Sequence, residues 1–137
     1  MSRLPATGFT LLEMLVVLTI LTLLMSFVGP NFLGQLETSG DRFATDQFRS
    51  QLVQLPRWAR LLGQPIKVDE ISDNWQLGNE ELLTLPPGWG AKFEPALAIS
   101  TSQVCTSSTV TVFKAKGELA TTFLIEGPGC TVTEATQ

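Results

Sequence analysis

The chain begins with a continuous apolar block. Residues 9–27 are mostly apolar, and residues 14–36 carry no charge. A helix that rises about 1.5 Å per residue over 9–27 covers most of a hydrocarbon core about 30 Å thick. Because apolar residues continue to Leu33, residues 9–33 predict a transmembrane helix.

A second, amphipathic helix is predicted over residues 41–62. Apolar residues recur there at steps of three and four, which is the spacing of one helix face. They are Ala44, Phe48, Leu52, Leu55, Ala59 and Leu62. Pro56 interrupts the pattern, so we expect a kink or a split around Leu55. Gly63 is a suitable helix terminator.

Beyond Gly63 the apolar period shortens toward two, which predicts a β-rich segment over residues 64–132. Turns are marked by Pro86-Pro87-Gly88 and by Lys116-Gly117. Residues 131–137 are expected to fray. The predicted strands are 66–68, 75–77, 82–85, 109–113 and 119–125. The fold class is therefore predicted to be α+β, with a long N-terminal helix packed on an antiparallel sheet.

Composition excludes several classes of function. There are 9 Lys and Arg against 13 Asp and Glu with no run of like charge, so we expect no nucleic acid as partner. The absence of histidine removes the Ser-His-Asp triad, the Cys-His pair and His-based zinc sites. Two cysteines are too few for a structural zinc site, and no phosphate-binding loop is present. We therefore expect no enzyme activity, no cofactor and no metal site.

Glu13 is a carboxylate near the edge of the apolar block. On insertion scales such a charge costs roughly 2.5–3.5 kcal/mol at the bilayer centre, which makes it a functional candidate. The nearest basic residue, Arg3, lies before the block. Cleavage before Phe9 would create a free α-amine about one helical turn from Glu13. That amine could pair with Glu13 of the same chain or of a neighbour.

The residues from Gly8 to Leu18 read Gly-Phe-Thr-Leu-Leu-Glu-Met-Leu-Val-Val-Leu. This segment resembles the class III leader and N-terminal helix of type IV pilins and type II secretion pseudopilins. The resemblance implies that a prepilin peptidase removes residues 1–8 by cutting between Gly8 and Phe9, and methylates Phe9. It also implies that Glu13 docks each subunit against the N-terminus of a neighbour.

The resemblance further implies a pilin-like fold and a location. The protein would cross the bacterial inner membrane once, in contact with the lipid bilayer, and place a head, residues 34–137, in the periplasm. Gly29-Pro30 would introduce a bend or a locally unwound stretch, because proline removes a helix hydrogen bond. The other interpretation of Gly29-Pro30 is simply the end of the membrane span.

Cys105 and Cys130 would lie on the oxidising side of the membrane, where disulfides persist. Pilins often tie down a C-terminal loop in this way, so the resemblance favours a Cys105–Cys130 bond, with two free thiols as the alternative. By the chain-entropy estimate, closing this loop would contribute roughly 3 kcal/mol.

Two further groups of residues have a simpler interpretation than ligand binding. Trp58, Trp75 and Trp89 fit core or rim packing better than a binding platform. Glu80-Glu81 fits a solvated turn better than a pair of calcium ligands.

Within the family, the absence of tyrosine counts against the major pseudopilin, and Glu13 counts against the largest minor pseudopilin. The segments 85–89 and 113–117 are similar to the H-type minor pseudopilin of type II secretion. This similarity implies a subunit at or near the tip of a pseudopilus that drives protein export. Its partners would be the prepilin peptidase, other pilin or pseudopilin subunits, the inner-membrane assembly platform and secreted cargo. A minor pilin of a type IV or competence pilus, and a membrane-anchored periplasmic binding module or enzyme, are the alternatives.

Overall fold

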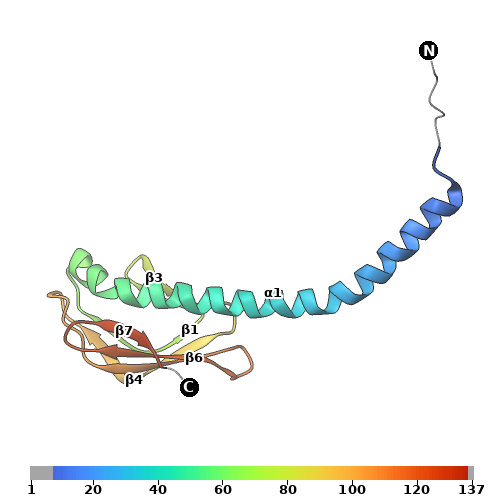
Figure 1. The fold of residues 1–137 in the computed structure, drawn as a ribbon. Coiled ribbons are helices and arrows are strands. Elements are labelled where there is room, and N and C mark those ends of the chain that lie inside the picture. The colour runs from blue at the N-terminus through green and yellow to red at the C-terminus, as the bar shows by residue number, and fades with distance from the viewer. Residues whose placement is uncertain (1–7, 136–137) are drawn as a thin grey trace, which may run out of the picture. The chain divides into compact units, whose positions relative to one another are not determined.

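The computed structural model describes residues 8–135, with residues 27–37 described by their backbone alone. The chain divides into two compact units, Met1–Ser39 and Gly40–Gln137, and the second is called the head below. One helix and seven strands follow each other along the chain (Figure 1). The α+β class predicted from the sequence is confirmed.

A single helix, α1 (Leu11–Leu62), joins the two predicted helical segments, in agreement with the long N-terminal helix expected from the sequence. Of the kink or split expected near Leu55, the split is wrong, because α1 continues through Pro56, and the kink stays a prediction. Leu52, Leu55 and Ala59 lie on either side of the proline and are at most 2% exposed. Their burial outweighs the cost of proline inside a helix, about 3 kcal/mol.

The C-terminal end of α1 is closed by Gly63, as predicted. Gly63 has a φ of 63°, which an L side chain rarely adopts. The Gly63 N–H donates to the Arg60 carbonyl at 3.3 Å, and the Gln64 N–H donates to the Ala59 carbonyl at 3.2 Å. These two bonds form a Schellman motif, which satisfies carbonyls that the helix leaves open.

The head contains one antiparallel sheet in the order β3-β2-β1-β4-β5-β6-β7. From β1 the chain runs outward through β2 to the edge strand β3. It then returns to the other side of β1 with β4 and continues to the opposite edge, β7. The strands are β1 (Ile66–Ser72), β2 (Asn74–Leu77), β3 (Glu80–Thr84), β4 (Gly90–Ile99), β5 (Ser108–Phe113), β6 (Leu119–Glu126) and β7 (Thr131–Glu134). The five predicted strands are confirmed, and β4 and β7 were missed.

The missed strand β4 lies at the centre of the sheet. Pro95 obscures it in the sequence, because proline within an apolar alternation argues against a central strand. In the structure, pairing of β4 with β5 ends at Glu94, and pairing with β1 shifts register between Val68 and Glu70. Pro95 therefore lies where the ladder needs no N–H, and its carbonyl accepts a hydrogen bond from the Ser108 hydroxyl at 2.7 Å.

The predicted fraying of residues 131–137 is wrong for β7. This strand pairs with β6 from Glu126↔Thr131 to Phe123↔Glu134, and Val132 is only 7% exposed. One buried side chain together with the ladder hydrogen bonds is enough to order this edge.

The apolar face predicted for residues 41–62 packs on the sheet (Figure 1). Phe48, Leu52, Leu55 and Ala59 are buried, whereas Ala44 and Leu62 are partly buried. The ring centroids of Phe48 and Phe123 are 6.4 Å apart, which joins the helix to β6.

The three tryptophans belong to the same core. Trp89 is 8% exposed, and Trp58 and Trp75 are partly buried against the core residues. Packing is therefore confirmed as their role. Glu80 and Glu81 are exposed at the start of β3, and no cluster of three metal-ligating side chains occurs among the described residues.

An ion pair connects the turn after β5 to the helix. The Lys114 Nζ lies 2.6 Å from the Asp41 carboxylate and 3.9 Å from that of Glu118. The hydrogen bond to Asp41 raises the pKa of Lys114 above its usual value. Because the pair is partly exposed, solvent screens it and its contribution to stability is small.

Candidate functional site

Thr10 and Glu13 form the start of α1. The Thr10 hydroxyl accepts a hydrogen bond from the Glu13 N–H at 3.3 Å, and the Thr10 carbonyl accepts from the N–H groups of Glu13 and Met14 at 3.1 and 3.3 Å. Thr10 is therefore the N-cap, and Glu13 occupies the third helical position. The sequence analysis missed this role of Thr10, although the Thr-x-x-Glu spacing of a capping box was visible.

Glu13 is exposed in the first turn of α1, and none of the ion pairs among described side chains involves it. The N-terminal end of a helix carries a partial positive charge, which favours a carboxylate there. A free amine at Phe9, four residues earlier, would add a full positive charge at the same end. The capping role and a docking role for Glu13 therefore act at the same place and are compatible.

The apolar side chains between Phe9 and Met25 are exposed on every side of the helix. Their exposed fractions run from 44% at Val16 and Val17 to 84% at Leu11. A helix that is apolar all round needs an apolar environment, and the described residues of this chain do not provide one. Lipid or the helices of other subunits would cover this surface.

The hydroxyl groups of Thr19, Thr22 and Ser26 are satisfied within the helix, whereas no hydrogen bond from a described residue satisfies the Glu13 carboxylate. Thr19 donates to the Val16 carbonyl at 2.8 Å, Thr22 donates to the Thr19 carbonyl at 2.8 Å, and Ser26 donates to the Thr22 carbonyl at 3.1 Å. Such back-bonding leaves no hydroxyl that requires water. A helix surrounded by lipid must satisfy its polar groups in this way.

The remaining predicted residues of the N-terminal segment lie at its two ends. Gly8 and Phe9 are exposed ahead of α1, and residues 1–7 of the expected leader lie outside the described residues. Gly29 and Pro30 lie inside α1, so the backbone there is helical. The bend at these two residues and the cleavage between Gly8 and Phe9 stay predictions.

Across the described residues, no helix combines the length and the hydropathy that a membrane span requires.

The N-terminal pattern also has a counterpart in known proteins. Residues 5–29 match the prokaryotic N-terminal methylation motif. This match supports a type IV pilin-like protein with a prepilin-like leader, which implies processing by a prepilin peptidase and assembly with other pilin subunits. It also favours a structural subunit over an enzyme. No curated protein and no solved structure matches the chain.

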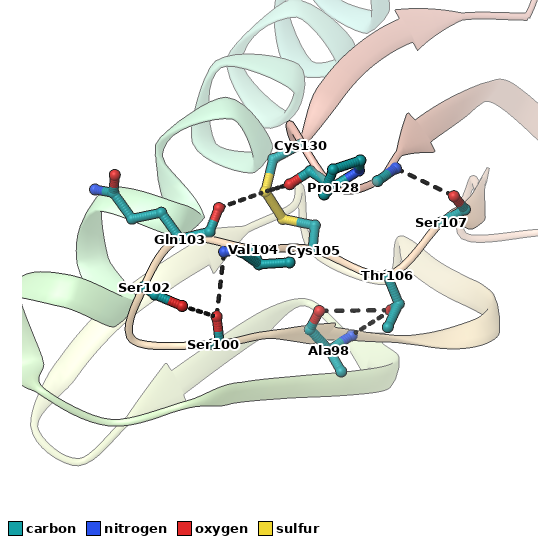
Figure 2. The surroundings of a disulfide bond; sticks show 11 residues. Ala98, Ser100, Ser102, Gln103, Val104, Cys105, Thr106, Ser107, Pro128 and Cys130 are labelled. Carbon is teal, nitrogen blue, oxygen red and sulfur yellow. Dashed lines mark hydrogen bonds between the residues drawn. A yellow bond between two sulfur atoms is a disulfide. The ribbon is translucent and has the colours of Figure 1, made fainter.

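In the head, Cys105 and Cys130 form a disulfide, which confirms the predicted bond. Their Cα atoms are 5.3 Å apart, and the bond joins the loop after β4 to the turn between β6 and β7 (Figure 2). Two hydrogen bonds hold the same two segments together. The Cys105 N–H donates to the Pro128 carbonyl at 3.2 Å, and the Gly127 N–H donates to the Ser107 hydroxyl at 3.1 Å.

The loop that carries Cys105 is ordered by its own hydrogen bonds (Figure 2). The Ser100 N–H donates to the Val104 carbonyl at 2.9 Å, and the Val104 N–H donates to the Ser100 hydroxyl at 3.2 Å. Thr106 closes the base, because its N–H donates to the Ala98 carbonyl at 2.9 Å and its hydroxyl accepts from the Ala98 N–H at 2.9 Å. The loop therefore presents Val104, which is 48% exposed, on a rigid support.

Proposed function

We propose that this protein is a minor pseudopilin of a type II secretion system, of the H type. The observation that carries the proposal is the apolar, exposed first half of α1 with Glu13 in its first turn, inside a segment that matches the methylation motif. The helix would anchor the precursor in the bacterial inner membrane with the head in the periplasm. The mature subunit would then join the pseudopilus at or near its tip.

The proposed mechanism is mechanical. The peptidase cuts between Gly8 and Phe9 and methylates the new amine. As the subunit leaves the lipid for the filament, Glu13 pairs with the Phe9 amine of a neighbouring subunit, since a charge in an apolar environment needs a partner. The assembly platform drives this step, and the head contacts neighbouring subunits or the exported protein.

The mature N-terminus tests the first step. The intact mass of the native chain, isolated from cells that contain the peptidase, should correspond to a chain that starts at Phe9 and carries one added methyl group. Gly8→Ala should leave the precursor mass in place of the mature mass. A native chain that still begins at Met1 would contradict the proposal.

Glu13 tests the docking step. Glu13→Val should leave insertion and cleavage nearly unchanged, but reduce incorporation into filaments by about tenfold or more, because the neighbour's amine then loses its partner. Thr22→Val is the matched control, since its hydroxyl bonds only to the Thr19 carbonyl of its own helix. Normal incorporation of Glu13→Val would exclude the docking role.

A minor pilin of a type IV or competence pilus is the second candidate, because the N-terminal methylation motif is common to both. Deletion of the gene separates the two. A pseudopilin should cause exported proteins to accumulate in the periplasm while surface pili remain. Loss of pili or of DNA uptake with normal secretion would instead support the minor pilin.

A further inference from the structure

The head half of α1 carries a basic face that points away from the core. Along a helix of 100° per residue, its exposed cationic and large apolar residues fall within about a third of the circumference, opposite the buried face. These residues are Arg42, Arg49, Arg57 and Arg60 together with Phe43, Val53 and Leu61. We call this surface the basic face. Asp46, the only carboxylate between residues 42 and 61, is exposed on the same arc, so the face carries four positive charges and one negative charge.

The arginines of the basic face form no ion pair with the described side chains, and its apolar side chains are mostly exposed. The ion pairs among described side chains are made by Lys92 and Lys114, not by these arginines. Phe43, Val53 and Leu61 are 71%, 54% and 64% exposed. Arginine and aromatic residues are enriched at the centres of protein interfaces, so this composition is typical of a contact surface.

A surface of opposite charge lies at one edge of the sheet. Residues 68–91 contain no lysine or arginine and carry five exposed carboxylates. The carboxylates belong to β1, to the β1–β2 turn and to β3, which is an edge strand. We call this surface the acidic wing; its carboxylates are Asp69, Glu70, Asp73, Glu80 and Glu81. None of them forms an ion pair with the described side chains, although Glu70 lies opposite Lys92 of β4. The Asp73 and Glu81 carboxylates also accept hydrogen bonds within the head, from the Gly88 N–H and the Thr84 hydroxyl.

We propose that the basic face of one copy docks on the acidic wing of a second copy of this chain. The two surfaces are complementary in charge and belong to different parts of the head, so the contact is heterologous. Heterologous contacts that do not close into a ring add copies in one direction, which is how helical filaments grow. That this contact would help a filament to grow rests on the proposed function above. It requires at least two adjacent copies of this chain in the filament.

The apolar residues and the charges have different parts in this contact. Burial of Phe43, Val53 and Leu61 supplies area, whereas the arginines and carboxylates select the partner and the register. Because the charged groups are exposed, salt screens their attraction over about 8–10 Å at 0.1–0.15 M ionic strength. Association of two copies should therefore weaken as salt increases.

Exchange of the charges provides a test with the full-length chain. Two differently tagged copies are co-expressed, extracted in detergent and purified through one tag, and recovery of the other copy is measured. Both copies carry Glu13→Val, so that docking of the N-terminal helices does not contribute. The first variant is Arg49→Glu with Arg57→Glu, and the second is Glu80→Arg with Glu81→Arg. Lys67→Glu with Lys116→Glu is the control, because it changes the net charge as much as the first variant does without altering a residue of either surface.

Each charge variant should fail to pair with itself, with recovery about tenfold or more below that of the unchanged chain. A mixture of the first and second variants should recover pairing, because each reversed surface then meets its complement. The control should pair normally. Tryptophan fluorescence, which reports only on the head, should show that every variant is folded.

Three results would overturn the proposal. The first is unchanged self-pairing of the first variant. The second is a loss of pairing in the first variant that mixing with the second variant does not restore. This result is expected if the arginines bind anionic lipid or nucleic acid instead. The third is loss of pairing in the control as well. None of these results affects the filament function, because that depends on the mature N-terminus at Phe9 and on Glu13 in the wild-type background.

Discussion

At the residue scale, the closest backbone approach in the head is at Gly127. A Cβ on this residue would collide with the Cys105 carbonyl oxygen, and would lie 3.3 Å from the Ser107 nitrogen. The clash is with backbone atoms that are held by the disulfide and by hydrogen bonds, so they cannot move aside easily. Gly127 is therefore required by the same contact that places Cys105 next to Cys130.

Gly127→Ala should lower the free energy of unfolding of the head by about 1–3 kcal/mol, the usual cost of overpacking. Gly129→Ala is the control, because its Cβ would meet only the Thr131 hydroxyl at 3.9 Å. The measurement is denaturant unfolding followed by tryptophan fluorescence. Equal midpoints for the two variants would show that the backbone around residue 127 can shift to make room for a Cβ, and that glycine is not required there.

Other single residues show how far sequence reasoning reaches. Glu13 stands out because a charge beside an apolar block is unusual, and Thr10 carries a spacing that identifies a cap. Gly127 has no such signal, since the partner that excludes a side chain lies more than 20 residues away. The basic face was missed because its arginines form no run along the chain, although their helical spacing can be read from the sequence.

At the element scale, the two halves of α1 follow different rules. The first half is apolar on every side, whereas the second half is apolar on the face that packs on the sheet. Two phenylalanines five residues apart show the difference within the second half. Phe48 is 0% exposed and Phe43 is 71% exposed.

Phe48→Ala should reduce the free energy of unfolding of the head by about 3–5 kcal/mol, because it leaves a cavity against Phe123. Phe43→Ala should change it by no more than about 0.5 kcal/mol, since its side chain is mostly in solvent. Both are measured by the same fluorescence titration. A large loss for Phe43→Ala would mean that this side chain packs within its own head and is not available to a second copy.

Sheet order is the element-scale property that the sequence did not provide. Short apolar alternations predict strands, but they do not tell which strands are neighbours. β4 is the longest of the described strands and lies between β1 and β5. It was not predicted from the sequence because Pro95 interrupts its apolar alternation. β4 tolerates this proline because its pairing with β1 shifts register there, and a register shift depends on both strands of the pair.

At the scale of the whole molecule, the disulfide closes the C-terminal part of the head. The two cysteines are 25 residues apart, and the bond holds the β6–β7 turn against the loop after β4. In the folded head, hydrogen bonds already hold these two segments together. The disulfide therefore stabilises the head mainly by restricting the conformational freedom of the unfolded chain.

Cys105→Ser with Cys130→Ser should lower the free energy of unfolding by about 2–4 kcal/mol. Reduction of the wild-type chain with dithiothreitol should produce a similar loss, and should leave the double variant unchanged. A wild-type midpoint that does not respond to reductant, with free thiols confirmed by labelling, would show that the hydrogen bonds alone hold the C-terminal segments.

The sequence alone determined the features that are local or periodic. These are the apolar block, the leader-like motif with Glu13, the buried face of the second half of α1, and the turn residues. Each depends on the chemistry of neighbouring residues along the chain, which is why the periodicity of the pattern reveals it. Tertiary structure alone decided the central place of β4, the need for glycine at 127, and the separation of the basic face from the acidic wing. Those properties depend on which distant segments meet, and that is decided by packing of the whole head.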